Sequence, residues 1–150
     1  MISIKPEWCK RIEMGDKIIE VRKSEPKEIP FKAYIYETKG SFEKSKKLKG
    51  RGKVIGEFIC DSIEMFTMDY RQRDIERRFE ILKGACLSFE EAMDYQASAH
   101  VLYAWHISDL KIYAEPKELS VFNLTRPPQN YARINYHEGE ELITENIEED

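Results

Sequence analysis

The stretch GDKIIEVRK, residues 15–23, decides the fold expected for this 150-residue chain. Its side chains alternate in character: Ile19 and Val21 face one way, whereas Glu20 and Arg22 face the other. Alternation with a period of two is the pattern of a β-strand with one apolar face. The stretch therefore predicts a strand that places a carboxylate and a guanidinium side by side.

Short elements are expected on both sides of this strand. A strand over 3–6 and a helix over 7–14 precede it, and Gly15 stands where that helix would end. Further strands are expected over 31–39, 54–63, 100–107 and 109–119, and helices over 67–83 and 88–95. Ser88-Phe-Glu-Glu91 has the spacing of a capping box. Short strands mixed with a few helices, without regular βα alternation, favour an α+β barrel.

Composition places the chain among ordinary globular proteins, with 41% hydrophobic residues and 17 aromatic ones. No apolar run approaches the length of a membrane span, and the N-terminus lacks a signal-peptide h-region. The three cysteines and three histidines show no spacing typical of metal ligands. These observations favour a cytoplasmic protein without a metal or cofactor and without a membrane partner.

Charge divides the chain into two halves. Residues 1–83 hold 20 Lys/Arg against 15 Asp/Glu, a net charge of +5, whereas residues 84–150 hold 4 against 13, a net charge of −9. Seven of those acids lie in the last 13 residues, EGEELITENIEED. Such a segment cannot bury enough apolar surface to fold alone. We therefore expect one domain over 1–137 and an acidic, disordered tail over 138–150.

Residues 39–53, KGSFEKSKKLKGRGK, carry seven basic residues and three glycines. This composition predicts a flexible basic loop, whose Lys and Arg side chains could contact phosphates without sequence preference. A solvated insertion explains the same composition.

Two aromatic pairs are also candidates for binding. Tyr34 and Tyr36 share a strand face and could stack on a base, although aromatic residues at this spacing often pack in a core. Trp105 and His106 are neighbours in an apolar strand and must point to opposite faces. The pattern does not decide which of these two faces a cleft.

Six segments occur in the order seen in ASCH-domain proteins: SIKPEW, GDKIIEVRK, YIYETK, GKVIGEF, LYAWHI and LTRPPQNY. The chain resembles this family over residues 2–134 and is most similar to its small bacterial and prophage members. The resemblance implies a small mixed PUA-like β-barrel of about five to six strands with two to three short helices. It also implies that residues 17–23 line a ligand cleft, because this segment does so in ASCH proteins.

The resemblance leaves the question of enzymatic activity open. PUA domains recognise RNA, whereas one ASCH branch deacetylates acetylcytidine and another cleaves RNA. In the deacetylase branch a lysine is followed three residues later by a threonine, and a distant glutamate completes the site. Lys17 matches the lysine, but Glu20 stands at the threonine position and Ala85 at that of the glutamate. A carboxylate cannot replace a hydroxyl without altering the mechanism.

The sequence thus predicts a module that binds RNA or a nucleotide in a basic cleft beside the Lys17–Lys23 strand. Arg22 and Lys17 would anchor phosphate or base, and Glu20 would accept a hydrogen bond from a base amine. The full set of candidate binding residues is Lys5, Lys17, Glu20, Arg22, Lys23, Tyr36, Arg126 and Gln129.

Three other interpretations stay open. The first is a hydrolase acting on a modified nucleoside or RNA, with Lys17 as catalytic base and Glu20 beside it. The second is a phage-derived protein-interaction module whose acidic tail docks on a basic partner. In the third, Glu20 and Arg22 are only an ion pair on a solvated strand face.

Overall fold

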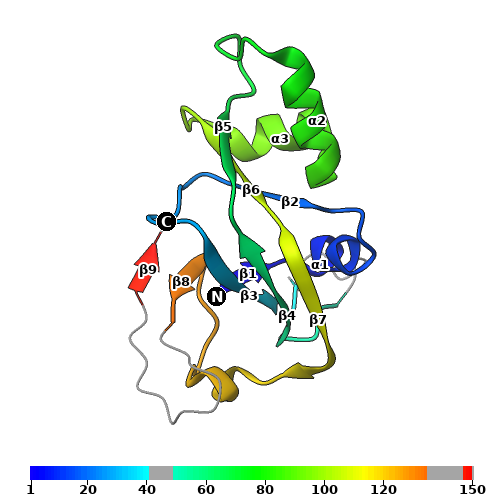
Figure 1. Ribbon diagram of the computed structural model, residues 1–150, viewed down its shortest axis with the longest axis vertical. Helices are drawn as coiled ribbons and strands as arrows, with labels where there is room; N and C mark the ends of the chain where they lie inside the picture. The colour runs from blue at the N-terminus through cyan, green and yellow to red at the C-terminus, as the bar shows by residue number, and fades with distance from the viewer. Residues whose placement is uncertain (41–48, 135–146, 150) are drawn as a thin grey trace. The chain divides into compact units, whose positions relative to one another are not determined.

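The computed structural model describes residues 1–40, 49–134 and, as a short strand, 147–149. The chain forms two compact units. Unit 1 comprises residues 1–10, 32–58 and 110–150, and unit 2 comprises residues 11–31 and 59–109. Figure 1 shows the order of the elements along the chain.

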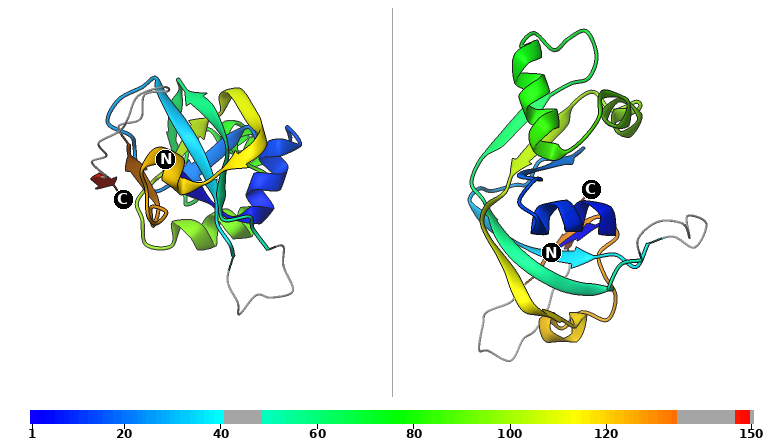
Figure 2. Two further views of the ribbon diagram at one scale, coloured as in Figure 1. Left: turned by 90° about the horizontal axis from the view of Figure 1, so that it is seen from below. Right: turned by 90° about the vertical axis from the view of Figure 1, so that its right-hand side faces the viewer.

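Unit 1 is built on a six-stranded sheet with the strand order β7-β4-β3-β1-β8-β9. Its strands are β1 (Ile2–Ile4), β3 (Phe31–Glu37), β4 (Lys53–Cys60), β7 (Ser108–Lys117), β8 (Tyr131–Arg133) and β9 (Ile147–Glu149). β1 runs parallel to β3 and antiparallel to β8. The longer strands β3, β4 and β7 run alongside one another (Figure 2). On this sheet, Tyr36 and Val54 pack in a buried cluster with Phe122 of the 3₁₀ helix η2 (Leu119–Phe122).

Helix α1 (Pro6–Glu13) begins directly after β1. Pro6 suits the first helical position, because its fixed φ matches the helix and the missing N–H has no partner there. The backbone N–H groups of Trp8 and Cys9 both donate to the carbonyl oxygen of Lys5. The chain therefore turns from strand into helix within two residues.

The proline-rich segment after η2 is fixed to β1. The hydroxyl of Ser3 donates to the Pro128 carbonyl at 2.6 Å, and the Ser3 backbone N–H donates to the Asn130 carbonyl at 2.9 Å. These bonds align the chain to enter β8, which pairs with β1 through Ile2 and Tyr131. The Ser3 hydroxyl and backbone N–H therefore hold this segment beside β1.

Unit 2 combines a three-stranded antiparallel sheet, of order β2-β6-β5, with two helices. The strands are β2 (Ile19–Arg22), β5 (Ile63–Phe66) and β6 (Leu102–His106), and the helices are α2 (Ile75–Ala85) and α3 (Phe89–Gln96). The core of the unit joins the sheet to the helices: Ile19, Val21, Phe66, Leu102 and Ala104 pack with Ile81, Leu82, Ala85 and Ala92. One face of the sheet is therefore covered by α2 and α3.

Both helices of unit 2 begin at polar side chains. Asp74 accepts from the Arg77 backbone N–H at 2.9 Å. Ser88 accepts from the Glu91 backbone N–H, and the Glu91 carboxylate accepts from the Ser88 backbone N–H, each at 3.0 Å. The capping box expected from the sequence is therefore present, and α3 begins where the spacing placed it.

The α+β class is confirmed, because the described residues contain three α-helices and two sheets. They contain nine strands, more than the five to six expected: β8 and β9 have three residues each, and β5 begins at Ile63, where the strand expected over 54–63 would end. The closed barrel stays a prediction, as does a single domain over 1–137. Most of the basic loop and of the acidic tail lies outside the described residues. No helix among the described residues is long and apolar enough to cross a membrane.

Candidate nucleic-acid site

The register of β2 and β6 assigns the predicted residues to one face of the unit 2 sheet. Glu20 lies opposite Trp105, and Arg22 lies opposite Tyr103. Because opposed residues in a sheet share a face, these four side chains lie together. Ile19 and Val21 face the other way, into the core beneath α2 and α3. The alternation expected for this strand is therefore confirmed by its pairing.

A buried ion triad lies at β2. Glu20 accepts from the Arg22 Nη2 at 2.8 Å, and its other oxygen lies 3.4 Å from the Lys17 Nζ. The side chains of Lys17, Glu20 and Arg22 are 2%, 8% and 12% exposed. The pair is therefore not on a solvated strand face, and that interpretation was wrong.

Lys17 reaches its position by folding back against the end of α2. Its Nζ donates to the Ala85 carbonyl oxygen at 2.8 Å, across 68 residues of sequence. Ala85 is the residue that falls at the position of the distant glutamate in the deacetylase branch. Here that position supplies a backbone carbonyl, and the carboxylate beside the lysine comes from Glu20 on the strand.

The pKa of Glu20 reflects two opposing causes. Burial raises the pKa of this carboxyl, but the charges of Arg22 and Lys17 and their hydrogen bonds outweigh burial and lower it overall. The carboxylate is therefore ionised at neutral pH, between two cations. The triad carries a net charge of +1.

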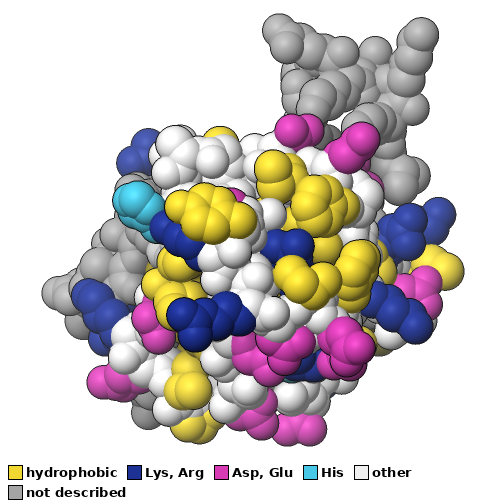
Figure 3. All heavy atoms as spheres, turned by 90° about the horizontal axis from the view of Figure 1, so that it is seen from above, with side chains coloured by type: hydrophobic (Ala, Val, Ile, Leu, Met, Phe, Trp, Pro, Cys, Tyr) yellow, Lys and Arg dark blue, Asp and Glu magenta, His cyan; other side chains and the backbone are white. Residues whose placement is uncertain are grey.

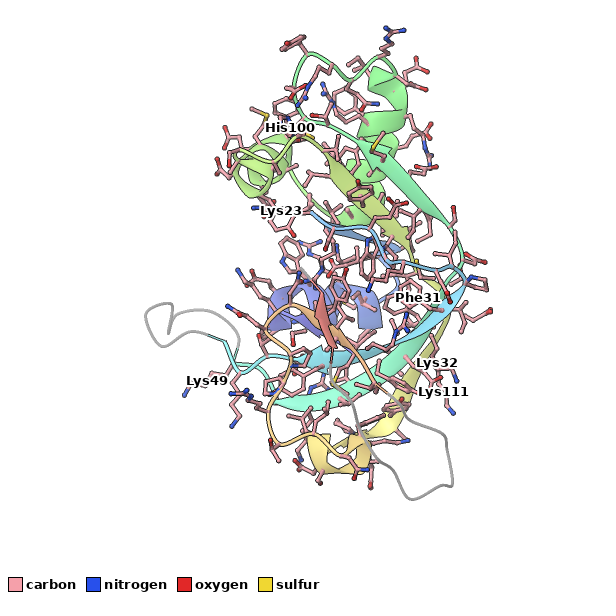
Figure 4. All side chains as sticks on the ribbon, turned by 90° about the vertical axis from the view of Figure 1, so that its left-hand side faces the viewer. Lys23, Phe31, Lys32, Lys49, His100 and Lys111 are labelled. Atoms are coloured by element: carbon pink, nitrogen blue, oxygen red, sulfur yellow. The ribbon has the colours of Figure 1, made fainter. Side chains whose placement is uncertain are left out.

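Tyr95 of α3 borders the triad and belongs to no motif that marks it in the sequence. The ammonium of Lys23 lies 5.1 Å from the centre of the Tyr95 ring. Figure 4 shows Lys23 beside α3. Burial raises the pKa of Tyr95, and the charges of Arg22 and Glu20 act on it with opposite signs. Only a contact between residues 72 positions apart reveals this neighbour, so no local pattern could have found it.

The structure also decides the faces of Trp105 and His106. Trp105 lies on the Glu20 face, 1% exposed, with its Nε1 donating to the Ser24 carbonyl and its ring edge-on to Phe31. His106 lies on the opposite face, 3.8 Å from the Glu64 carboxylate. His106 therefore lies away from the triad.

The remaining predicted residues belong to unit 1. Lys5, Arg126 and Gln129 are exposed; Lys5 directly follows β1, and Gln129 lies between Pro128 and Asn130, which both bond to Ser3. Tyr36 is 4% exposed within the η2 cluster, so its ring offers no open face to a base. Tyr34 packs against Phe122 with 4.9 Å between ring centres. Of the tyrosine pair, the core interpretation holds for Tyr36.

Two other surfaces of unit 2 lie outside the triad. Exposed hydrophobic side chains, interspersed with both basic and acidic ones, gather on the face shown in Figure 3. The exposed hydrophobic residues of α2, α3 and the loop before α2 are Tyr70, Ile75, Phe79, Phe89, Met93 and Tyr95. A pocket of about 240 Å³ lies between that loop and the end of α3, lined in part by Asp69, Arg71, Gln96 and His100. None of the predicted site residues lines it.

A metal centre would need several His, Cys, Asp or Glu side chains close together. Within residues 1–40, 49–134 and 147–149, no three such side chains come together as metal ligands would. The three predicted residues that the structure brings together are Lys17, Glu20 and Arg22, in the buried ion triad.

Comparison by sequence gives no relative: neither a family model nor a curated protein matches the chain. Comparison by structure gives an ASCH protein from Zymomonas mobilis, 22% identical, with a TM-score of 0.64 over 86% of this chain and 82% of that one. A serine-to-alanine and a tyrosine-to-phenylalanine variant of the same protein match with TM-scores of 0.63. The chain therefore has the fold of an ASCH domain.

Proposed function

We propose that this protein binds RNA, or a nucleotide, at the β2 edge of unit 2, with Arg22 and Lys23 as the contacting cations. The observation that supports this most is the 2.8 Å bond from Arg22 to Glu20, which fixes the orientation of the guanidinium. A guanidinium held in place loses less entropy on binding phosphate or a base edge. Lys23 adds an exposed ammonium next along the chain.

Lys17 and Glu20 have supporting roles in this proposal. The Lys17 ammonium is buried and bonded to Ala85 and Glu20, so it positions the carboxylate and adds positive field. With Lys23 included, the group carries three positive charges and one negative. This local balance attracts phosphate although the whole chain is acidic. The PUA-like barrel expected from the ASCH fold agrees with an RNA-binding role.

The test is fluorescence anisotropy with short labelled RNA, single-stranded DNA and duplexes at two salt concentrations. Arg22→Gln is expected to weaken RNA binding and to reduce the salt slope by about 1. Lys23→Gln should act in the same direction. Lys83→Gln removes an equal charge from an exposed site on α2 and serves as the control. Absence of RNA binding by the unmodified protein would contradict the proposal.

The hydrolase alternative is favoured by one observation, the buried Lys17–Glu20 pair at the position where the ASCH deacetylase branch has its lysine. Turnover of acetylcytidine or of RNA, lost in Lys17→Ala, would support it. The protein-interaction alternative predicts indifference to RNA and loss of a partner when residues 138–150 are removed.

A further inference from the structure

The face of the unit 2 sheet that carries Glu20 and Arg22 also carries the aromatic side chain of Tyr103. Register places Arg22 of β2 opposite Tyr103 of β6, and Tyr103 opposite Met65 of β5. We name these three residues the Arg22–Tyr103–Met65 row. The adjacent row on the same face contains Glu20, Trp105 and Ile63 by the same pairing.

The two rows differ in exposure. Trp105 and Glu20 are 1% and 6% exposed, whereas Tyr103 is partly exposed and Met65 is 66% exposed. The helices cover the opposite face, where Ala104 and Phe66 enter the core. Along the Arg22–Tyr103–Met65 row, exposure is 12% for the Arg22 side chain, partial for Tyr103 and highest for Met65, so the ring lies between a fixed cation and an exposed thioether.

We infer that Tyr103 is the stacking platform for an unpaired base of single-stranded RNA, with Arg22 beside it for the phosphate or base edge. This inference rests on the proposed RNA-binding function and names its substrate class. An aromatic side chain on an open sheet face stacks a base whatever its identity, because every base has a π-face. Met65 extends the apolar surface on the far side of the ring, and a thioether packs favourably at an aromatic edge.

The geometry excludes double-stranded RNA as the preferred ligand of this row. Bases within a duplex are stacked on one another and cannot lie on a protein ring. Cross-strand neighbours in a sheet stand about 5 Å apart, so the cation and the ring can serve one nucleotide. A single unstacked nucleotide therefore meets both groups.

The experiment compares Tyr103→Leu with Tyr103→Phe in anisotropy titrations of a short oligouridylate, a short oligoadenylate and a duplex RNA. Leucine keeps an apolar side chain in the row but removes the ring, and phenylalanine keeps the ring. We expect Tyr103→Leu to weaken single-strand binding about 5- to 150-fold, the loss of one base–aromatic stack, and Tyr103→Phe to retain it. Tyr70→Leu removes a 94% exposed tyrosine elsewhere in unit 2 and should change nothing.

Salt dependence separates stacking from charge. Tyr103→Leu should lower the affinity with an unchanged salt slope, because it removes no cation from the phosphates, whereas Arg22→Gln should lower both. If Arg22→Gln abolishes binding and Tyr103→Leu does not, the platform is wrong and the proposed function stands. If the unmodified protein binds no RNA, both are wrong.

A second variant covers the case in which Tyr103→Leu does not fold. Met65 is 66% exposed, so Met65→Glu leaves the core intact and places a negative charge in the row. We expect Met65→Glu to bind single-stranded RNA more weakly than the unmodified protein, with the largest difference at low salt. Equal affinity of Met65→Glu and the unmodified protein would overturn the inference.

Discussion

Glu20 is the one carboxylate in the ion triad of unit 2, and both of its oxygens face cations. Charges removed from water cost several kcal/mol each, and here the mutual attraction of three charges offsets that cost. The triad depends most on Glu20, because its removal leaves two like charges buried without compensation.

Glu20→Gln tests this dependence. The amide has the shape of the carboxylate but no charge, so Lys17 and Arg22 would remain buried as like charges. We expect the free energy of unfolding at pH 7 to fall by about 3–5 kcal/mol, the usual cost of breaking a buried pair. Urea denaturation of both proteins measures this difference in unfolding free energy. Glu25→Gln, at an exposed position of unit 2, is the control and should change the free energy by less than about 0.5 kcal/mol.

The same residue predicts a pH dependence. The pKa of Glu20 is lowered in the folded protein, so its stabilising contribution is complete above the unfolded-state pKa of about 4.3. That contribution disappears as the pH falls through the lower pKa of the folded state. The difference in unfolding free energy between the unmodified protein and Glu20→Gln should be constant from about pH 8 to 6 and shrink below about pH 4. A difference that grows with acidity would contradict the sign of the shift.

At the scale of residues, the sequence predicted which side chains share a face but not how deeply they are buried. Alternation involves residues close together in the sequence, so the sequence was sufficient to predict that Glu20 and Arg22 are neighbours on one strand face. The contact of Lys17 with Ala85, and that of Lys23 with Tyr95, join positions about 70 residues apart. No short-range sequence pattern reveals such contacts. For this reason Lys17 was expected to contact the ligand although it is buried, and Tyr95 was not among the predicted residues.

Elements were predicted where a chemical signal marks their ends. The capping box at Ser88 placed α3 correctly, because two reciprocal hydrogen bonds fix the first turn. Helix α2 begins at Ile75, later than expected, because Asp74 caps it and the charged residues before it form turns. Charge alone does not distinguish a helix face from an exposed loop.

Ser88→Ala should reduce the free energy of unfolding by about 1 kcal/mol, the usual cost of removing an N-cap side chain. The hydroxyl accepts from Glu91 at 3.0 Å and has no equivalent in alanine. Chemical denaturation measures the change, and Ser120→Ala at an exposed position of η2 is the control. Equal destabilisation of the two variants would contradict a capping role.

Ala97, which ends α3, has φ of 47° and ψ of −116°. This left-handed region strains any residue with a Cβ and costs glycine little. Ala97→Gly is therefore expected to raise the melting temperature, with a gain of about 0.5–1 kcal/mol in unfolding free energy. Ala92→Gly, inside the same helix, should lower it, because glycine is disfavoured in a helix and the Ala92 methyl is buried in the core.

For the molecule as a whole, net charge is a poor guide to binding. The formal charge is −4, but the acids concentrate near the C-terminus and the bases in the first 83 residues. The basic segment 39–53 begins and ends in unit 1, where the Gly50 backbone N–H donates to the Lys39 carbonyl at 3.2 Å. Lys49, at the end of that segment, is exposed (Figure 4).

Replacing Lys44, Lys46, Lys47 and Lys49 by glutamine should reduce the salt slope of RNA binding, by about 0.7 for each phosphate that these lysines neutralise. The two proteins should differ most at low salt and converge at high salt. Anisotropy titration over a series of salt concentrations measures the slope. An unchanged slope would mean that the segment is a solvated insertion.

The sharing of Glu20 between two cations has a consequence for how this protein can evolve. A substitution at position 20 leaves two buried positive charges, whereas a substitution at position 17 or 22 leaves one balanced pair. The three positions are therefore not equivalent, and the carboxylate should be the last of them to be replaced. Among natural variants of this chain, loss of the acid at position 20 should accompany loss of the cation at 17 or 22.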